Sequence, residues 1–276
     1  MKKIILIALN LLIINSAFTQ TWKGIVIDVN SRKQLEFVNI GVLHKNKGTV
    51  TNEIGKFSFD LTNLSDYDTI RISYIGYEHT DILVGQCKNY LLELNDASIE
   101  LTPISFSIDE VVITANKTKK IITGNNIKSS IVVSGFRNNE LGSEVGTVLK
   151  YRKKKKGYII SLNFNIASNN YDSLFFRVNL YKMKNGLPSK NILQKPIYVN
   201  STIQKGTLTV NLSKENISIK EDSFVSIELV KNLGKNGLYF KTAFLKSPSF
   251  AKQTSQSDWN KTSVDLGFWA EISYEK

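Results

Sequence analysis

Short runs of alternating apolar and polar residues follow one another along most of the chain, and this pattern constrains the fold more than any other feature. Trp22–Val29 and Lys56–Leu61 are early examples, and Tyr158–Ile166 and Asp265–Tyr274 are late ones. Alternation places successive side chains on opposite faces of a strand, so each run predicts a half-buried β-strand. Turn-forming residues separate the runs, and helical periodicity is scarce. We therefore expect an all-β protein.

Length and charge predict two domains. The chain has 276 residues, of which 42% are hydrophobic, which is enough for two ordinary cores. Residues 20–115 contain eight basic and 13 acidic side chains, whereas residues 116–276 contain 26 basic and 11 acidic ones. Strands spaced about 8–12 residues apart are typical of sandwiches. We expect one sandwich at 20–115, a polar linker at 116–130, and a basic jelly-roll-like sandwich at 131–276.

The N-terminus has the pattern of an export signal. Two lysines precede the apolar run Ile4–Ile14, and small residues, Ala17 and Thr19, precede a cut before Gln20. The run is shorter than the roughly 20 residues of a membrane-spanning helix. We expect a signal peptide at 1–19 and an exported protein, periplasmic or associated with the outer membrane or cell surface. An uncleaved anchor is the alternative.

The first half resembles a known family. "GIVIDVNSRKQLEFVNIGV", "GTVTNEIGKFSFDL", "IRISYIGYEHTDILV" and "IDEVVITA" follow one another in order. Together they are similar to the carboxypeptidase regulatory-like domain, found at the periplasmic N-terminus of many TonB-dependent outer-membrane receptors of Bacteroidetes. The resemblance covers residues 21–115 and implies a transthyretin-like (prealbumin-like) β-sandwich. The second half matches no named family.

Single residues of these motifs have structural interpretations. We expect Gly55 to supply a positive φ in a turn, and Gly76 to bend the chain between two strands. Phe57 and Phe59 alternate, so they should face the core together. The single cysteine, Cys87, excludes an intrachain disulfide, and we expect it to fill apolar space.

No residue pattern indicates catalysis, so we expect no enzyme, no cofactor and no metal. His44 and His79 lack a glutamate three residues later, so neither begins the His-x-x-Glu pair of a zinc carboxypeptidase. Asp66 and Asp68 are two apart in a loop, which is compatible with calcium but more typical of turn hydrogen bonds.

Two features of the second half are candidates for ligand binding. Lys153, Lys154, Lys155 and Lys156 form a basic run that would suit an anionic envelope polymer. The alternative is a solvated hairpin between strands 147–152 and 158–166, because lysines also suppress edge-to-edge pairing. Since we expect export, nucleic acid is not an expected partner.

Aromatic residues near the C-terminus give the second candidate. Trp259 stands in the polar stretch "QSDWNK" and is expected to be an exposed ring for a glycan. Phe268 and Trp269 are adjacent within one strand, so they face opposite ways and at least one should be core.

The stretch "DEVVITA", residues 109–115, has two interpretations. It is expected to be the closing strand of the first sandwich. Alternatively, Glu110, Val111, Val112 and Thr114 dock as a strand on a partner's sheet edge.

These features lead to one preferred function and two alternatives. We expect a non-catalytic envelope protein whose sandwiches bind a glycan, an anionic polymer or an outer-membrane protein. The first alternative is an accessory or signalling partner of a TonB-dependent transport system. The second is an unrecognised enzyme in the C-terminal domain.

Overall fold

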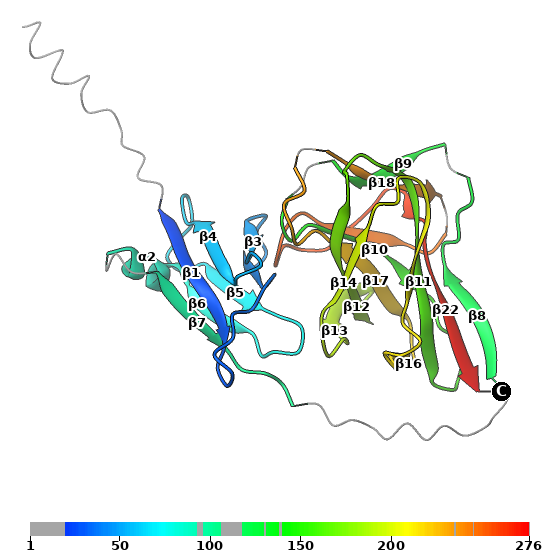
Figure 1. The fold of residues 1–276 in the computed structure, drawn as a ribbon, viewed down its shortest axis with the longest axis horizontal. Helices are drawn as coiled ribbons and strands as arrows, with labels where there is room; N and C mark the ends of the chain where they lie inside the picture. The colour runs from blue at the N-terminus through cyan, green and yellow to red at the C-terminus, as the bar shows by residue number, and fades with distance from the viewer. Residues whose placement is uncertain are drawn as a thin grey trace, which may run out of the picture.

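The strands form two sandwiches that lie side by side (Figure 1). The computed structural model describes residues 20–92, 96–105, 118–129, 131–137, 140–234, 236–244 and 246–275. Strands dominate both halves, so the all-β fold class predicted from the sequence is confirmed. The expected signal peptide lies outside the described residues, and so does the expected strand 109–115.

The first sandwich packs a three-stranded sheet against a four-stranded one. The sheet orders are β4-β1-β7, in which β1 and β7 run parallel, and β3-β2-β5-β6. The elements are β1 (Thr21–Asp28), β2 (Asn39–Val42), β3 (Gly48–Val50), β4 (Lys56–Asp60), β5 (Thr69–Ser73), β6 (Thr80–Leu83), α2 (Val84–Leu92) and β7 (Ala97–Leu101).

The core of this sandwich follows the alternation in the sequence. Phe57 and Phe59 of β4 are buried, as predicted, and Ser58 between them is exposed. Gly55, just before β4, has a φ of 69°, and Gly76 has a φ of 86°. Both values lie in the region where a Cβ would clash, so both predictions for these glycines are confirmed.

The short helix α2 was not predicted from the sequence. Helical periodicity is scarce in the sequence, but the chain is helical over Val84–Leu92. Val84 and Cys87, three residues apart, share one side of the helix and are fully buried. Burial raises the pKa of Cys87 to about 12, so this thiol serves as apolar filler.

The second sandwich contains the remaining described strands. They are β8 (Thr118–Gly124), β9 (Val133–Phe136), β10 (Glu144–Leu149), β11 (Gly157–Asn169), β12 (Leu174–Lys184), β13 (Leu187–Asn191), β14 (Ile197–Ser201), β15 (Gly206–Asn211), β16 (Ser218–Ile219), β17 (Ser223–Glu228), β18 (Leu238–Ala243), β19 (Ser249–Lys252), β20 (Asn260–Lys261), β21 (Asp265–Leu266) and β22 (Phe268–Glu275).

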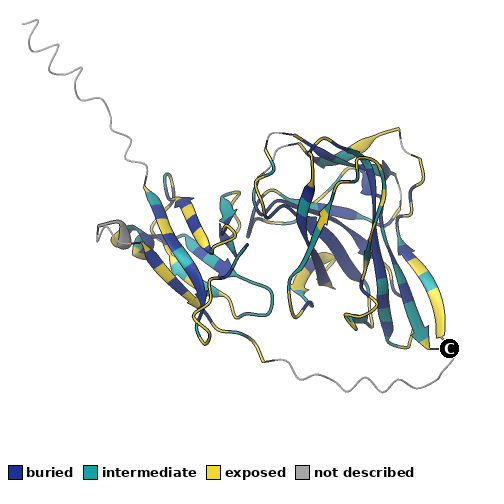
Figure 2. Cartoon of the chain, in the orientation of Figure 1, coloured by how far each residue is buried: buried dark blue, intermediate teal, exposed yellow. Residues whose placement is uncertain are grey.

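Eight of these strands make a jelly roll. One sheet contains β8-β22-β11-β15 as successive neighbours and the other contains β10-β17-β12-β14. Counted along the chain, these orders are first-eighth-third-sixth and second-seventh-fourth-fifth, which is the jelly-roll arrangement of two Greek keys. We call them the β11 sheet and the β12 sheet. Their inner faces share a core in which Phe164, Phe240 and Phe268 are fully buried. Figure 2 shows buried residues along the strands of both sheets.

The structure corrects two expected connections. Residues 118–124, expected within the linker, form β8, which pairs with β22 from Thr118 to Gly124. This strand lies at a sheet edge and is largely exposed, so its sequence lacks a clear apolar face. The second sandwich therefore begins at Thr118. The lysine run, expected in a hairpin, instead joins β10 of one sheet to β11 of the other.

Candidate functional site

The lysine run lies in a loop that a tyrosine holds in place. Residues 153–155 are exposed and Lys156 is half-buried. Buried Tyr151 donates a hydrogen bond from its hydroxyl to the carbonyl of Lys155 at 2.8 Å. A Cβ on Gly157 would come within 2.7 Å of the Tyr151 ring, so the loop closes tightly on that ring. The lysines therefore project from a fixed turn.

Strands of the β11 sheet place aromatic and basic residues beside this loop. The Lys153 ammonium lies 5.4 Å from the ring centre of Tyr274, and the Lys156 ammonium lies 5.5 Å from that of Tyr158. Tyr274 is in register with Lys119 of β8, which is exposed. The lysine loop and three strands, β8, β11 and β22, thus contribute to one basic and aromatic surface, which we call the basic end.

One acidic residue is already engaged at the basic end. Asp222 accepts the backbone N–H of Tyr151 at 2.8 Å and pairs with Arg152 at 3.2 Å. Arg152 therefore offsets the negative charge of this carboxylate. Such a surface attracts polyanions, and ring faces beside ammonium groups suit sugar rings that carry acidic groups.

Trp259 is not the exposed ring that we expected. It is half-buried and packs edge-on against Phe224 at 5.0 Å and Tyr181 at 5.8 Å. The Lys252 ammonium lies 5.0 Å from its ring centre. Trp259 thus covers an apolar cluster on the outer face of the β12 sheet, whereas the basic end contacts the β11 sheet. The structure does not combine the two sequence candidates into one site.

A row of four charged residues crosses the outer face of the β12 sheet. Arg177, Glu228, Glu144 and Lys252 are successive cross-strand partners on β12, β17, β10 and β19. Arg177 contacts Glu228 at 2.8 Å, and Lys252 contacts Glu144 at 2.6 Å. Both glutamates are fully buried, so the row is an internal ion network.

Neighbouring charges shift the pKa values of Glu228 and Arg177. Burial by itself would raise the pKa of Glu228, but Arg177 and Lys252 outweigh it and lower that pKa below its ordinary value. Burial would likewise lower the pKa of Arg177, and Glu228 raises it instead. Asn179 donates to both carboxylates, at 2.9 Å to Glu144 and 2.7 Å to Glu228. Arg177 and Glu228 therefore stay ionised near neutral pH.

Arg177 also ties the jelly roll to the first sandwich. Its guanidinium donates to the carbonyl of Phe37 at 2.7 Å and to the Asn39 amide oxygen at 2.8 Å. Apolar residues of both sandwiches, including Phe37, Val50 and Val230, form a shared buried cluster. The first sandwich thus covers part of the outer face of the β12 sheet.

Glycines allow a second close approach between the sandwiches. A Cβ on Gly41 would lie 2.1 Å from the carbonyl oxygen of Ser255, and one on Gly48 would lie 2.6 Å from the same atom. Ser255 is fully buried and donates to the carbonyl of Thr49 at 2.9 Å. Sequence reasoning missed this contact, since a glycine in a strand marks a close approach without naming its partner.

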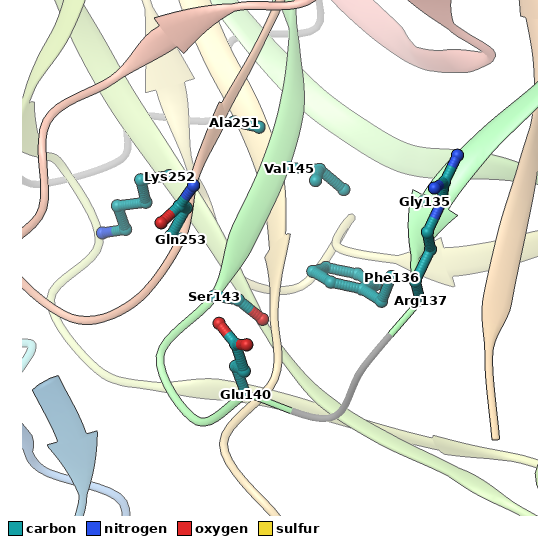
Figure 3. A pocket seen from close by; sticks show the side chains of 9 residues that line it. All are labelled: Gly135, Phe136, Arg137, Glu140, Ser143, Val145, Ala251, Lys252 and Gln253. Carbon is teal, nitrogen blue, oxygen red and sulfur yellow. The ribbon is translucent and has the colours of Figure 1, made fainter. Parts of the chain in front are cut away.

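A hollow of about 400 Å³ opens where β9 and β19 border the jelly roll. Figure 3 shows Phe136 and Val145 at its centre and Lys252 turned away from them. The Phe136 ring packs edge-on against Phe240 in the core, so it offers no free face for stacking. The Ser143 hydroxyl is buried and has no hydrogen-bond partner among the described residues.

The residues weighed for catalysis or metal binding lie apart or are paired. His44 contacts Asp258 at 2.7 Å, and His79 lies 4.0 Å from Asp81. The two aspartates of the loop after β4 pair with lysines, Asp66 with Lys88 and Asp68 with Lys45, both at 2.6 Å. Within the described ranges, no three His, Cys, Asp or Glu residues group as metal ligands.

The docking proposal for Glu110, Val111, Val112 and Thr114 falls outside the described residues and stays a prediction. The last described strand before them is β7, which pairs with β1. Among the described elements, none is a helix with the length and apolar character needed to cross a membrane.

Comparisons with known proteins support the N-terminal resemblance. The CarboxypepD_reg-like domain family matches residues 22–113, which confirms the resemblance of the first sandwich. This match ends before β8 and covers less than half of the chain. No curated protein matches the chain.

Two solved structures of Cwp84 are similar to this chain. The clostridial cysteine protease Cwp84 after propeptide cleavage is 12% identical, with a TM-score of 0.38, 58% of this chain covered and 40% of that one. The cysteine protease and lectin-like domains of Cwp84, a surface layer associated protein of Clostridium difficile, are 9% identical, with a TM-score of 0.40 and coverages of 87% and 59%. This chain spans less than two thirds of either structure. At these TM-scores, neither bears on its fold or function.

Proposed function

We propose that this chain, whose first sandwich matches the CarboxypepD_reg-like domain, is a non-catalytic binding protein of the bacterial envelope. Its jelly roll binds an anionic polymer, in particular an acidic envelope glycan, at the basic end. The observation that carries the proposal is the convergence of Lys153–156 with Tyr158, Tyr274 and β8 on one fixed turn.

The geometry favours a polymer over a small anion. The lysine side chains project from the surface rather than converge in an enclosed cavity, so each meets a different part of a long ligand. Residues 116–276 carry a large excess of basic side chains, which attracts a polyanion from a distance. The ring faces beside Lys153 and Lys156 add contacts with sugar rings.

Location and lack of catalysis belong to the same proposal. The basic and apolar N-terminal segment supports export to the periplasm or the cell surface. The family of the first sandwich is compatible with a binding domain. The two histidines lie on the first sandwich and lack the spacing of a zinc site.

Charge neutralisation tests the proposal directly. Replacing residues 153–156 with glutamine should weaken binding of the full chain to immobilised polygalacturonate by up to about a thousandfold, since each lysine near an anionic surface contributes roughly 1 kcal/mol. A matched control replaces four other exposed lysines, Lys182, Lys184, Lys190 and Lys205, with glutamine. The control loses the same charge, so it should retain most of the affinity.

Two results would reject the proposal. One is equal weakening in both fourfold variants, which would assign binding to net charge alone. The other is no binding of the unaltered chain at moderate salt. Trp259→Ala provides a separate test on a neutral glycan array, where a loss of binding would move the sugar site to the β12 sheet.

A further inference from the structure

Four large apolar side chains are exposed together on the jelly roll. Ile131, Val132, Val133 and Phe244 have exposures of 103%, 43%, 46% and 63%. They lie on two segments that β-pairing brings together, since Val133 of β9 faces Lys241 of β18. We call these four residues the apolar tip. Ile131 is as exposed as it would be in an extended peptide, so no other described residue shields it.

Hydrogen bonds hold the apolar tip in this exposed position. Thr242 donates from its hydroxyl to the carbonyl of Val132 at 2.5 Å, and Lys241 donates to the carbonyl of Lys128 at 2.7 Å. Asn125 and Ser247 bind each other through two hydrogen bonds, at 2.9 and 2.8 Å. The two segments thus present the tip outward as one unit, although burying the four side chains would lower the free energy.

The surroundings of the tip are basic. The segments 125–137 and 238–248 contain Lys128, Arg137, Lys241 and Lys246 and no acidic residue. Lys128, Arg137 and Lys246 are exposed, like the tip itself. Apolar side chains bordered by cations match a surface that is anionic outside and apolar beneath.

We propose that the apolar tip is a docking surface for an anionic lipid bilayer. Its four side chains insert at the boundary between headgroups and acyl chains, while the bordering lysines contact lipid phosphates. The basic border favours lipid headgroups over a second copy of this basic chain.

The tip is distinct from the basic end. The basic end lies beside Lys119, at the start of β8, and the tip follows Gly124, at the end of the same strand (Figure 1). These residues are about 17 Å apart along the strand, at about 3.3 Å per residue. The lipid proposal does not rest on glycan binding. If both are correct, the chain contacts a polymer and a bilayer with different parts of one sandwich.

A site-specific label tests the proposal. Ile131→Cys in the full chain is labelled with an environment-sensitive dye, and Cys87 does not react because it is fully buried. On vesicles of phosphatidylethanolamine and phosphatidylglycerol, the dye at position 131 should shift to the blue. The matched control is Leu187→Cys, at an exposed apolar residue of β13, and its dye should not shift. The apolar segment Ile4–Ile14 is common to both proteins and cannot cause a difference between them.

A second variant measures the strength of docking. Ile131→Ser with Phe244→Ser should lower partitioning onto the same vesicles by about tenfold for each side chain. Its unfolding midpoint should stay unchanged, because both residues are exposed. Lack of a shift at position 131, or an equal shift at positions 131 and 187, would overturn the proposal. If the dye at position 131 shifted to the blue on raising the protein concentration without vesicles, the tip would bind a second copy of the chain, and the bilayer proposal would be rejected.

Discussion

Two arginine–carboxylate pairs, one in each sandwich, both join neighbouring antiparallel strands and differ in surroundings. Arg71 of β5 faces Asp81 of β6, with nitrogen–oxygen distances of 2.8 and 2.7 Å. Arg177 of β12 faces Glu228 of β17, with distances of 3.1 and 2.8 Å. The side chains of the first pair are 31% and 36% exposed, and those of the second are 2% and 0% exposed.

The difference shows how one motif acquires two roles. In the exposed pair, water screens the charges, so the attraction adds little to stability. In the buried pair each charge depends on its partners, and Arg177 reaches across to Phe37 and Asn39 of the other sandwich. The buried pair therefore commits this face of the jelly roll to contact with the first sandwich.

Removing the buried arginine should have the largest effect. Arg177→Met leaves Glu228 and Glu144 buried with Lys252 as their remaining cation, and also removes both bonds to the first sandwich. We expect a loss of about 3–5 kcal/mol of unfolding free energy, which urea unfolding of the full chain measures. The double variant Arg177→Met with Glu228→Gln removes one charge of each sign and should recover part of this loss. A loss below about 1 kcal/mol for the single variant would show that the row is solvated.

Gly41 tests the contact between the two sandwiches through steric fit instead of charge. Gly41→Ala puts a Cβ 2.1 Å from the backbone oxygen of Ser255, and a backbone atom moves only if the sandwiches separate. We expect a cost of about 1–3 kcal/mol and a larger radius of gyration in small-angle scattering. Gly48→Ala is the graded comparison, since its Cβ would meet that oxygen at 2.6 Å and should cost less. Unchanged scattering with Gly41→Ala would argue against the contact.

The sequence predicted the strands better than their burial. The run 158–166 alternates because one of its faces lies in the core, and it is a strand. β8 was missed because an exposed edge strand has no apolar face to recognise. Glu144 and Arg177 occupy the outward positions of alternating strands, where charges normally meet water. Arg177 is buried because the first sandwich covers it, and no local sequence pattern indicates that contact.

Acid should weaken the buried row. The folded pKa of Glu228 is lowered, so this carboxyl contributes stability that is fully present above its unfolded pKa, about 4.3, and is lost as the pH falls through the folded value. The urea concentration at the unfolding midpoint should therefore decrease once the pH is lowered below about 4.5. Glu228→Gln has no group to titrate there, so its midpoint should fall less steeply. Parallel curves would mean that other carboxyls cause the acid effect.

The exposed arginine should have the smallest effect. Arg71 donates two hydrogen bonds to Asp81 and thereby lowers the pKa of that aspartate. Arg71→Met removes both bonds. Because Asp81 then returns to water instead of staying buried without a partner, the expected loss is only about 0.2–1 kcal/mol. High salt should shrink it further, whereas the loss in Arg177→Met should persist, since buried charges are poorly screened. If the two variants responded alike to salt, burial would not be what separates the two pairs.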